Sequence, residues 1–279
     1  MSKKVYELVT QKIIEKLEKG VVPWKVPFQN HIAVNWKTQK PYRGINVLLL
    51  DPGEYATYKQ IKQHGGKIKK GEKSQIAVFW KWLEYPDEEN EEEIKRIPFL
   101  RYYRVFEINT QVEGLKSKRK FVEYQHDPIE KAEQIIAGYK NPPKITFQPR
   151  GAWYRPSDDL VNMPDKKEFE SVHEYYSTFF HELVHSTGHK KRLNRKGVIN
   201  VERASKEYAR EELIAEIGAS MLCGIAGIDN EIIDNSASYI QYWLRRLKND
   251  PKLVVHASQQ AQKACDYILG EVNEIRKSA

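Results

Sequence analysis

The chain has 279 residues, 40% of them hydrophobic, which is enough for one large domain or two smaller ones with buried cores. No apolar run approaches the roughly 20 residues of a membrane-spanning helix, and the N-terminal segment has no secretory signal pattern. Cys223 and Cys265 lie among apolar residues in helical patterns, which predicts buried, reduced thiols rather than a disulfide framework. We therefore expect a cytoplasmic protein without a membrane partner.

The charge is concentrated in the first part of the chain. Residues 1–125 contain 24 Lys and Arg against 16 Asp and Glu, a net charge of +8, whereas residues 126–279 contain 22 of each. Seven of those 16 acidic residues fall in one run, EYPDEENEEE at 84–93, so the remainder of the first part is more basic still. This asymmetry indicates a polyanionic partner for the N-terminal part.

The N-terminal part begins with a predicted helix over residues 3–19, where apolar residues repeat every four positions before Gly20. Two segments rich in aromatic and β-branched residues, 75–83 and 97–108, predict the strands of a hairpin. The acidic run between them is expected to form a solvated loop. The basic segment that follows, 114–120, is expected to be a linker.

The C-terminal part is predicted to be mainly helical. Residues 144–164 are interrupted by prolines and indicate short strands and turns. Long helical patterns follow at 166–187, 203–224, 231–248 and about 256–275. The fold class we expect is α+β, with a small basic domain at 1–125 and a mainly helical domain with a short sheet at 126–279.

The segment YYSTFFHELVHSTGH (175–189) contains a possible metal site. His181 and His185 are four residues apart, so on a helix their rings lie on one face and can bind one ion. Glu182 projects beside them, as the general base of an H-E-x-x-H zinc site does. The spacing therefore predicts zinc bound by the two histidines, with Glu182 as the catalytic residue.

A third protein ligand is needed, because zinc sites of this type use three and leave one position open. Lys191 occupies the position where one pattern has a third histidine, and the neighbouring His189 is one alternative. Glu212 and Glu216 are another, since they share one face of a predicted helix and point toward its buried side. Either carboxylate is a possible third ligand from the spacing alone.

Two further features would complete a peptidase site. Tyr208 and His256 are candidates for stabilising an oxyanion, although nothing in their spacing selects either one. The segment GAWYRP (151–156) is either an edge strand that pairs with an extended peptide or an ordinary sheet edge.

The basic part is also rich in aromatic residues, as in NWKTQKPYRGIN (35–46) and FLRYYRVF (99–106). Bases of single-stranded nucleic acid stack on aromatic rings while Lys and Arg contact the phosphates. Each such ring is alternatively part of a core. The residues that we expect to contact single-stranded DNA, because they cluster in one loop, are Trp36, Lys37, Tyr42 and Arg43.

Taken in order, several segments resemble the ArdC antirestriction proteins, over about residues 5–270. The segments that carry the resemblance are NWKTQKPYRGINVLLL (35–50), RYYRVFEI (101–108), DLVNMP (159–164), HELVHSTGHKKRLNR (181–195) and EYAREELIAEIGASML (207–222). The resemblance implies an N-terminal domain that binds single-stranded DNA, a zincin-like metallopeptidase domain, and protection of incoming mobile-element DNA from restriction. The acidic run at 84–93 is not part of the pattern.

The segment E-x-x-A-E-x-x-A at 212–219 also resembles a helix of gluzincin peptidases. This second resemblance implies that Glu212 is the third ligand and that Glu216 supports a histidine ligand. Because the second position is Glu rather than the shorter Asp or Asn, the two roles are open to reversal.

Three functions are compatible with these features. The first is a single-stranded DNA-binding antirestriction protein whose peptidase-type site is structural or idle. The second is a DNA-bound metalloprotease that cleaves a protein on DNA. The third is a metalloprotease whose basic domain recruits an acidic protein.

Overall fold

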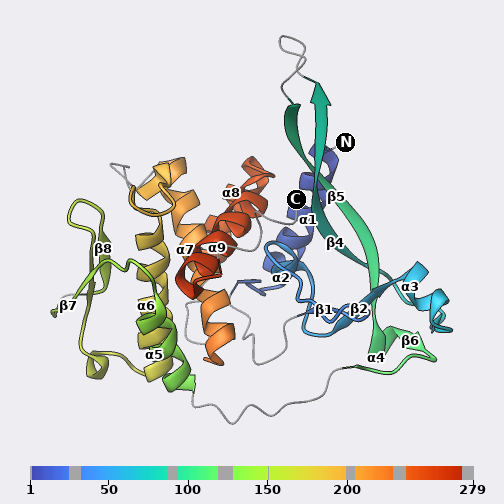
Figure 1. Cartoon of the computed structure of the whole chain (residues 1–279), viewed down its shortest axis with the longest axis horizontal. Coiled ribbons are helices and arrows are strands. Elements are labelled where there is room, and N and C mark those ends of the chain that lie inside the picture. The colour runs from blue at the N-terminus through green and yellow to red at the C-terminus, as the bar shows by residue number, and fades with distance from the viewer. Residues whose placement is uncertain are drawn as a thin grey trace.

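The computed structural model describes residues 2–24, 33–86, 94–118, 128–149, 151–198, 205–228 and 237–271. The described helices and strands form a mixed α+β structure, which confirms the predicted class. Figure 1 shows the small sheet β7-β9-β8 at one end of the molecule, helices in the middle and the β4–β5 hairpin at the other end. No helix among the described residues is both long and apolar enough to cross a bilayer.

The N-terminal half combines short helices with two sheets. Its elements are α1 (Ser2–Glu18), β1 (Val34–Asn35), α2 (Asn46–Leu49), β2 (Glu54–Thr57), α3 (Tyr58–Gln63), β3 (Lys67–Ile68), β4 (Gln75–Pro86), β5 (Ile94–Glu107), α4 (Ile108–Gln111) and β6 (Val112–Glu113). One sheet has the order β1-β2-β5-β4, and the other pairs β3 with β6.

Strands β4 and β5 confirm the predicted hairpin, with an antiparallel register that runs from Gln75 opposite Val105 to Pro86 opposite Ile94. Strand β4 continues to Pro86, so the first three residues of the predicted 84–93 loop are strand instead. Residues 87–93 lie outside the described part of the chain.

The C-terminal half is mainly helical. Its elements are α5 (Pro128–Gly138), β7 (Lys144–Phe147), β8 (Trp153–Arg155), β9 (Leu160–Met163), the 3-10 turn η1 (Lys166–Glu168), α6 (Val172–Thr187), the 3-10 turn η2 (Lys196–Val198), α7 (Lys206–Ala226), α8 (Ala237–Asn249) and α9 (Leu253–Leu269). In the sheet, β9 is central, with β7 parallel and β8 antiparallel to it.

Several helix boundaries differ from the prediction, and two of the differences have a clear local cause. The expected helix from 166 is divided, because Ser171 accepts a hydrogen bond from the backbone N–H of Glu174 and so caps a new helix, α6. The last helix ends at Leu269 rather than near 275, because Gly270 adopts the left-handed conformation with φ 76°.

Helix α1 belongs spatially to both halves. Its buried residues Val9 and Ile13 join a core cluster that also contains residues of α7, α8 and α9. The Thr10 hydroxyl donates to the carbonyl of Pro251 at 2.6 Å. The two halves therefore share one continuous core, while a domain boundary at residue 125 remains a prediction.

Candidate metal site

Helices α6 and α7 position the residues of the predicted metal site. Each helix begins after a serine cap. Ser171 caps α6, and the Ser205 side chain caps α7 by accepting a hydrogen bond from the backbone N–H of Tyr208. The two helices approach closely at Gly218, where an added Cβ would lie 2.8 Å from the side chain of Val184. A small residue at this crossing brings the two polar faces within reach of one another.

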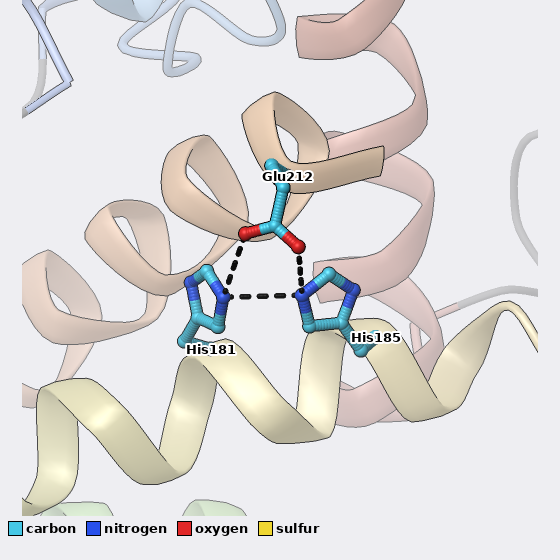
Figure 2. Close-up of side chains that lie close together, drawn as sticks. All are labelled: His181, His185 and Glu212. Carbon is cyan, nitrogen blue, oxygen red and sulfur yellow. Dashed lines mark hydrogen bonds and ion pairs between the residues drawn. The ribbon is translucent and has the colours of Figure 1, made fainter. Parts of the chain in front are cut away.

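The structure brings His181, His185 and Glu212 together. The two Nε2 atoms are 3.1 Å apart, and the Glu212 carboxylate places Oε2 3.6 Å from His181 Nε2 and Oε1 3.5 Å from His185 Nε2 (Figure 2). One ligand atom from each residue lies within 4.8 Å of the other two, so the group is able to hold one metal ion.

Charge and hydrogen bonding couple these three side chains. Burial acts to lower the pKa of His181, but the hydrogen bond to Glu212 and the charges of Glu182 and Glu216 outweigh it and raise the pKa to about 9. Burial acts to raise the pKa of Glu212, but His181 and His185 reverse this and lower it to about 2. The negative charge of the carboxylates around the two imidazoles therefore favours a bound cation at this position.

Glu211 is a residue of the site that the sequence reasoning missed. Its Oε1 lies 3.3 Å from Nδ1 of His185, on the side of the ring that faces away from the metal position. Arg195 donates to the same carboxylate through Nε at 2.9 Å and Nη2 at 2.5 Å. Burial acts to raise the pKa of Glu211, but the hydrogen bonds from Arg195 and His185 lower it below its usual value.

Glu216 occupies a different position from Glu211. It is half-buried, its charge raises the pKa of His181, and it interacts with the Tyr239 hydroxyl. The carboxylate is thus within electrostatic reach of the first histidine, and support of that ring by Glu216 remains a prediction. For His185 the supporting carboxylate is Glu211.

The three residues open onto a cleft of about 820 Å³. Glu182 is buried, with 9% of its surface exposed, and lines the cleft beside the two histidines. Tyr208 lines it as well and hydrogen-bonds Glu212. The predicted edge 151–156 contains β8, which is one of the two outer strands of its sheet and forms one wall through Trp153 and Tyr154.

Two histidines considered as site residues have other partners. His189 lines the cleft, but its Nδ1 lies 3.7 Å from Asp159 rather than at the three-residue group. His256 stacks on Tyr6 of α1, with ring centroids 5.7 Å apart, so the structure contradicts a role for it in the cleft.

A buried ion pair fixes the β8–β9 wall against the end of α6. Arg192, whose side chain is fully buried, pairs with Asp159 and donates through Nε to the carbonyl of Ser186 at 2.8 Å. Tyr154 of β8 donates to the same aspartate at 3.0 Å. The wall and the histidine helix are therefore held in one arrangement.

Asp159→Asn is expected to lower the free energy of unfolding by about 3 kcal/mol, because it leaves a buried guanidinium without its counter-charge. Burial acts to raise the pKa of Asp159, but Arg192 lowers it below its usual value. The aspartate therefore stabilises the fold above its unfolded-state pKa, and this contribution is lost as the pH falls through the folded-state value. Denaturant unfolding at neutral and acidic pH measures both effects.

Asp158→Asn is the matched control, since that side chain is 49% exposed and forms its ion pair with the half-exposed Arg155 on the surface. We expect a change below about 0.5 kcal/mol. Equal stability of the Asp159 and Asp158 variants would contradict the role of the buried pair.

The structure corrects two of the four expected DNA contacts. Trp36 is 4% exposed, and its indole N–H donates to the carbonyl of Lys116 at 2.9 Å. Tyr42 is 7% exposed within the main core. Neither ring is available to stack on a base, because a basic loop sequence does not show which side of the loop packs inward.

The other two expected contacts differ in their surroundings. Arg43 forms an ion pair with Asp266 of α9, so it joins the two halves of the molecule. Lys37 is exposed in the turn after β1, where the Asn35 side chain accepts from its backbone N–H at 3.1 Å. Its contact with DNA remains a prediction.

Comparison with known proteins agrees with these two halves. Residues 3–106 match the family described as the N-terminal domain of anti-restriction factor ArdC. Residues 130–260 match the family described as zincin-like metallopeptidase.

Relatives along the whole chain are also known. Two Escherichia coli proteins named DNA primase TraC are each 32% identical over 96% of this chain, which spans 20% and 27% of their lengths. The uncharacterized protein y4eC of Sinorhizobium fredii (strain NBRC 101917 / NGR234) is 30% identical, with 98% of this chain and 94% of that protein covered.

Solved structures extend the likeness to the fold. The metal-free crystal structure of antirestriction ArdC from plasmid R388 is 37% identical, covers 94% of this chain and 96% of its own, and superposes with a TM-score of 0.73. Its Mn(II)-bound form is 35% identical, with 96% and 98% covered and a TM-score of 0.74. With this identity over nearly the full length of both chains, the protein belongs to the ArdC antirestriction family.

Proposed function

We propose that this protein is a single-stranded DNA-binding antirestriction factor that carries a divalent metal ion, zinc, in a peptidase-type site. The observation that carries the metal part is the group of His181, His185 and Glu212 on two crossed helices. The Mn(II)-bound structure of an ArdC protein supports a divalent ion in this family. Two imidazoles and one carboxylate form a donor set that is typical of zinc sites with an open position.

The residues of the cleft define what the site is able to do. A bound divalent ion would supply Lewis-acid chemistry. Glu182, buried beside the histidines and lining the cleft, is positioned to accept a proton and return it. Among the described strands β8 pairs with β9 alone, and its other edge is suited to pairing with an extended peptide. This arrangement favours the DNA-bound metalloprotease as the second candidate function.

The DNA-binding part of the proposal rests on the charge of the N-terminal half and on a group of aromatic rings of the hairpin that includes the exposed Phe79. Phe79 of β4 is 41% exposed and lies directly opposite Arg101 of β5. The Phe99 ring lies 5.2 Å from the Arg101 guanidinium, and Tyr103 lies 5.8 Å from Phe79. Rings interleaved with a cation on one face are suited to stacking bases and contacting phosphates.

Phe79→Ala is expected to weaken binding of a labelled oligothymidylate about tenfold, since one base–aromatic stack contributes about 1–3 kcal/mol. Fluorescence anisotropy at several salt concentrations measures it. Phe147→Ala is the control, because that ring is 64% exposed but belongs to β7 in the other half. Salt-insensitive binding by the native protein would favour an acidic protein partner over DNA.

Glu182→Gln separates protection by binding from proteolysis. We expect the variant to keep its metal, its DNA affinity and its antirestriction activity in a plasmid-transfer assay, because Gln preserves the shape of the side chain but cannot take up a proton. Loss of antirestriction with metal and DNA binding intact would show that proteolysis is the mechanism.

A further inference from the structure

A second cavity lies on the side of α7 that faces away from the metal cleft. It has a volume of about 420 Å³ and lies between the first turns of α7 and the C-terminal half of α8. Its charged and aromatic lining residues, which we call the basic groove, are Lys206, Arg210, Tyr242, Arg245, Arg246 and Asp250.

The basic groove is strongly positive within a half of the chain whose net charge is zero. Among the described residues that line it, four side chains are cationic and one, Asp250, is a carboxylate, which lies 3.7 Å from Arg210. That pair is about half exposed, with 50% and 42% of the two side chains accessible, so Asp250 neutralises little of the surrounding charge. Lys206 and Arg245 are exposed at its rim.

An aromatic ring is built into the same groove. Tyr242 is half-buried, and the Arg246 guanidinium lies 5.2 Å from the centre of its ring. An aromatic ring and cations in one groove are suited to a nucleic-acid strand, because bases stack on rings while cations contact phosphates. Several cations along one groove fit a chain of phosphates better than a single small anion.

The basic groove and the metal cleft use different faces of the same helix, α7. Tyr208, Glu211 and Glu212 line the cleft, whereas Lys206 and Arg210 line the groove. At 100° per residue these two sets lie on opposite sides of the helix. A ligand in the groove is therefore separated from the metal site by about one helix diameter, roughly 10 Å.

We propose that the basic groove binds the phosphodiester backbone of single-stranded DNA, as a second contact surface outside the N-terminal half. This inference rests on the proposed DNA-binding function and extends it to the metallopeptidase-like half. A DNA strand bound in the groove lies on the side of α7 opposite the metal cleft. The cleft is therefore held close to the bound DNA.

Arg245→Gln/Arg246→Gln in the full chain tests the groove with a labelled oligothymidylate. Losing two phosphate contacts is expected to weaken binding about twentyfold at 0.1 M salt and to reduce the slope of log affinity against log salt by about 1.4. Lys140→Gln/Lys144→Gln removes the same charge from exposed positions elsewhere in this half and is expected to leave the slope unchanged. Unchanged affinity and slope in the arginine variant would overturn the proposal.

A second variant covers the case in which the first is unstable, and a second ligand distinguishes DNA from free phosphate. Lys206→Gln/Arg245→Gln alters exposed side chains only, and a similar loss is expected if the first variant proves unstable. Inorganic phosphate alone is expected to leave the melting temperature of the native protein unchanged. A phosphate-induced rise that the arginine variant lacks, with DNA binding intact, would identify a free-phosphate site and overturn the DNA assignment.

Failure of the inference is distinguishable from failure of the proposed function. If the native protein does not bind the oligonucleotide at all, the DNA-binding function is wrong. If the native protein binds and Phe79→Ala weakens binding while the groove variants do not, the groove proposal alone is wrong.

Discussion

His181→Ala/His185→Ala is expected to reduce the bound divalent metal from one ion per chain to none. The two imidazoles supply two of the three donor atoms that the structure brings within 4.8 Å of one another. A single carboxylate on a protein surface does not retain a transition metal against a chelator. Elemental analysis after dialysis against a weak chelator measures the loss.

His189→Ala is the matched control for this experiment. That histidine lines the same cleft, but its ring lies against Asp159. We expect full metal content in the control, and circular dichroism should show that both variants are folded. Undiminished metal in the double variant would contradict the site.

The same measurement ranks the two carboxylates of α7. Glu212→Ala removes a carboxylate whose two oxygens lie 3.5–3.6 Å from the two histidine nitrogens. Glu216→Ala removes a nearby charge and an interaction with the Tyr239 hydroxyl. Loss of an outer partner typically costs about 10–100-fold in affinity, and loss of a ligand should cost more. Weaker binding in the Glu216 variant than in the Glu212 variant would reverse the two roles.

The proximity of His181 and His185 was predictable from the sequence, because helical periodicity fixes their relative positions. Residues four apart on one helix share a face whatever the rest of the fold does, so His181 and His185 converge once the segment is helical. Glu212 required a resemblance as well, since spacing alone did not choose between it and Glu216. Glu211 was missed because its partner, Arg195, lies 16 residues upstream in a segment without helical periodicity.

The exposure of the residues expected to contact DNA was less predictable, for a physical reason. Trp36 and Tyr42 lie in a basic segment, yet both rings pack inward and the lysines point outward. An irregular segment has no periodicity that reveals its buried side, unlike a strand with its alternation. In the hairpin the register places Phe79 opposite Arg101, and that pairing becomes known only from the structure.

Glu211→Gln is expected to have two separable effects, because its carboxylate has two partners. The first is a loss of about 3 kcal/mol in the free energy of unfolding, since Arg195 and Glu211 are 6% and 4% exposed and the arginine would be left without a counter-charge. The second is a loss of about 10–100-fold in metal affinity, since the hydrogen bond that orients the His185 ring is weakened. Glu207→Gln, one turn earlier on α7 and exposed, is the control for both.

The double variant Arg195→Met/Glu211→Gln separates these effects. Removing both members of a buried ion pair avoids the isolated charge, so most of the lost stability is expected to return. Metal affinity should stay low, because Met at residue 195 restores no negative charge at Nδ1 of His185. Denaturant unfolding of the metal-free variants and titration with zinc measure the two quantities independently. If affinity recovers together with stability, Glu211 acts on the metal only by holding the fold, and the carboxylate has no direct part in orienting the histidine.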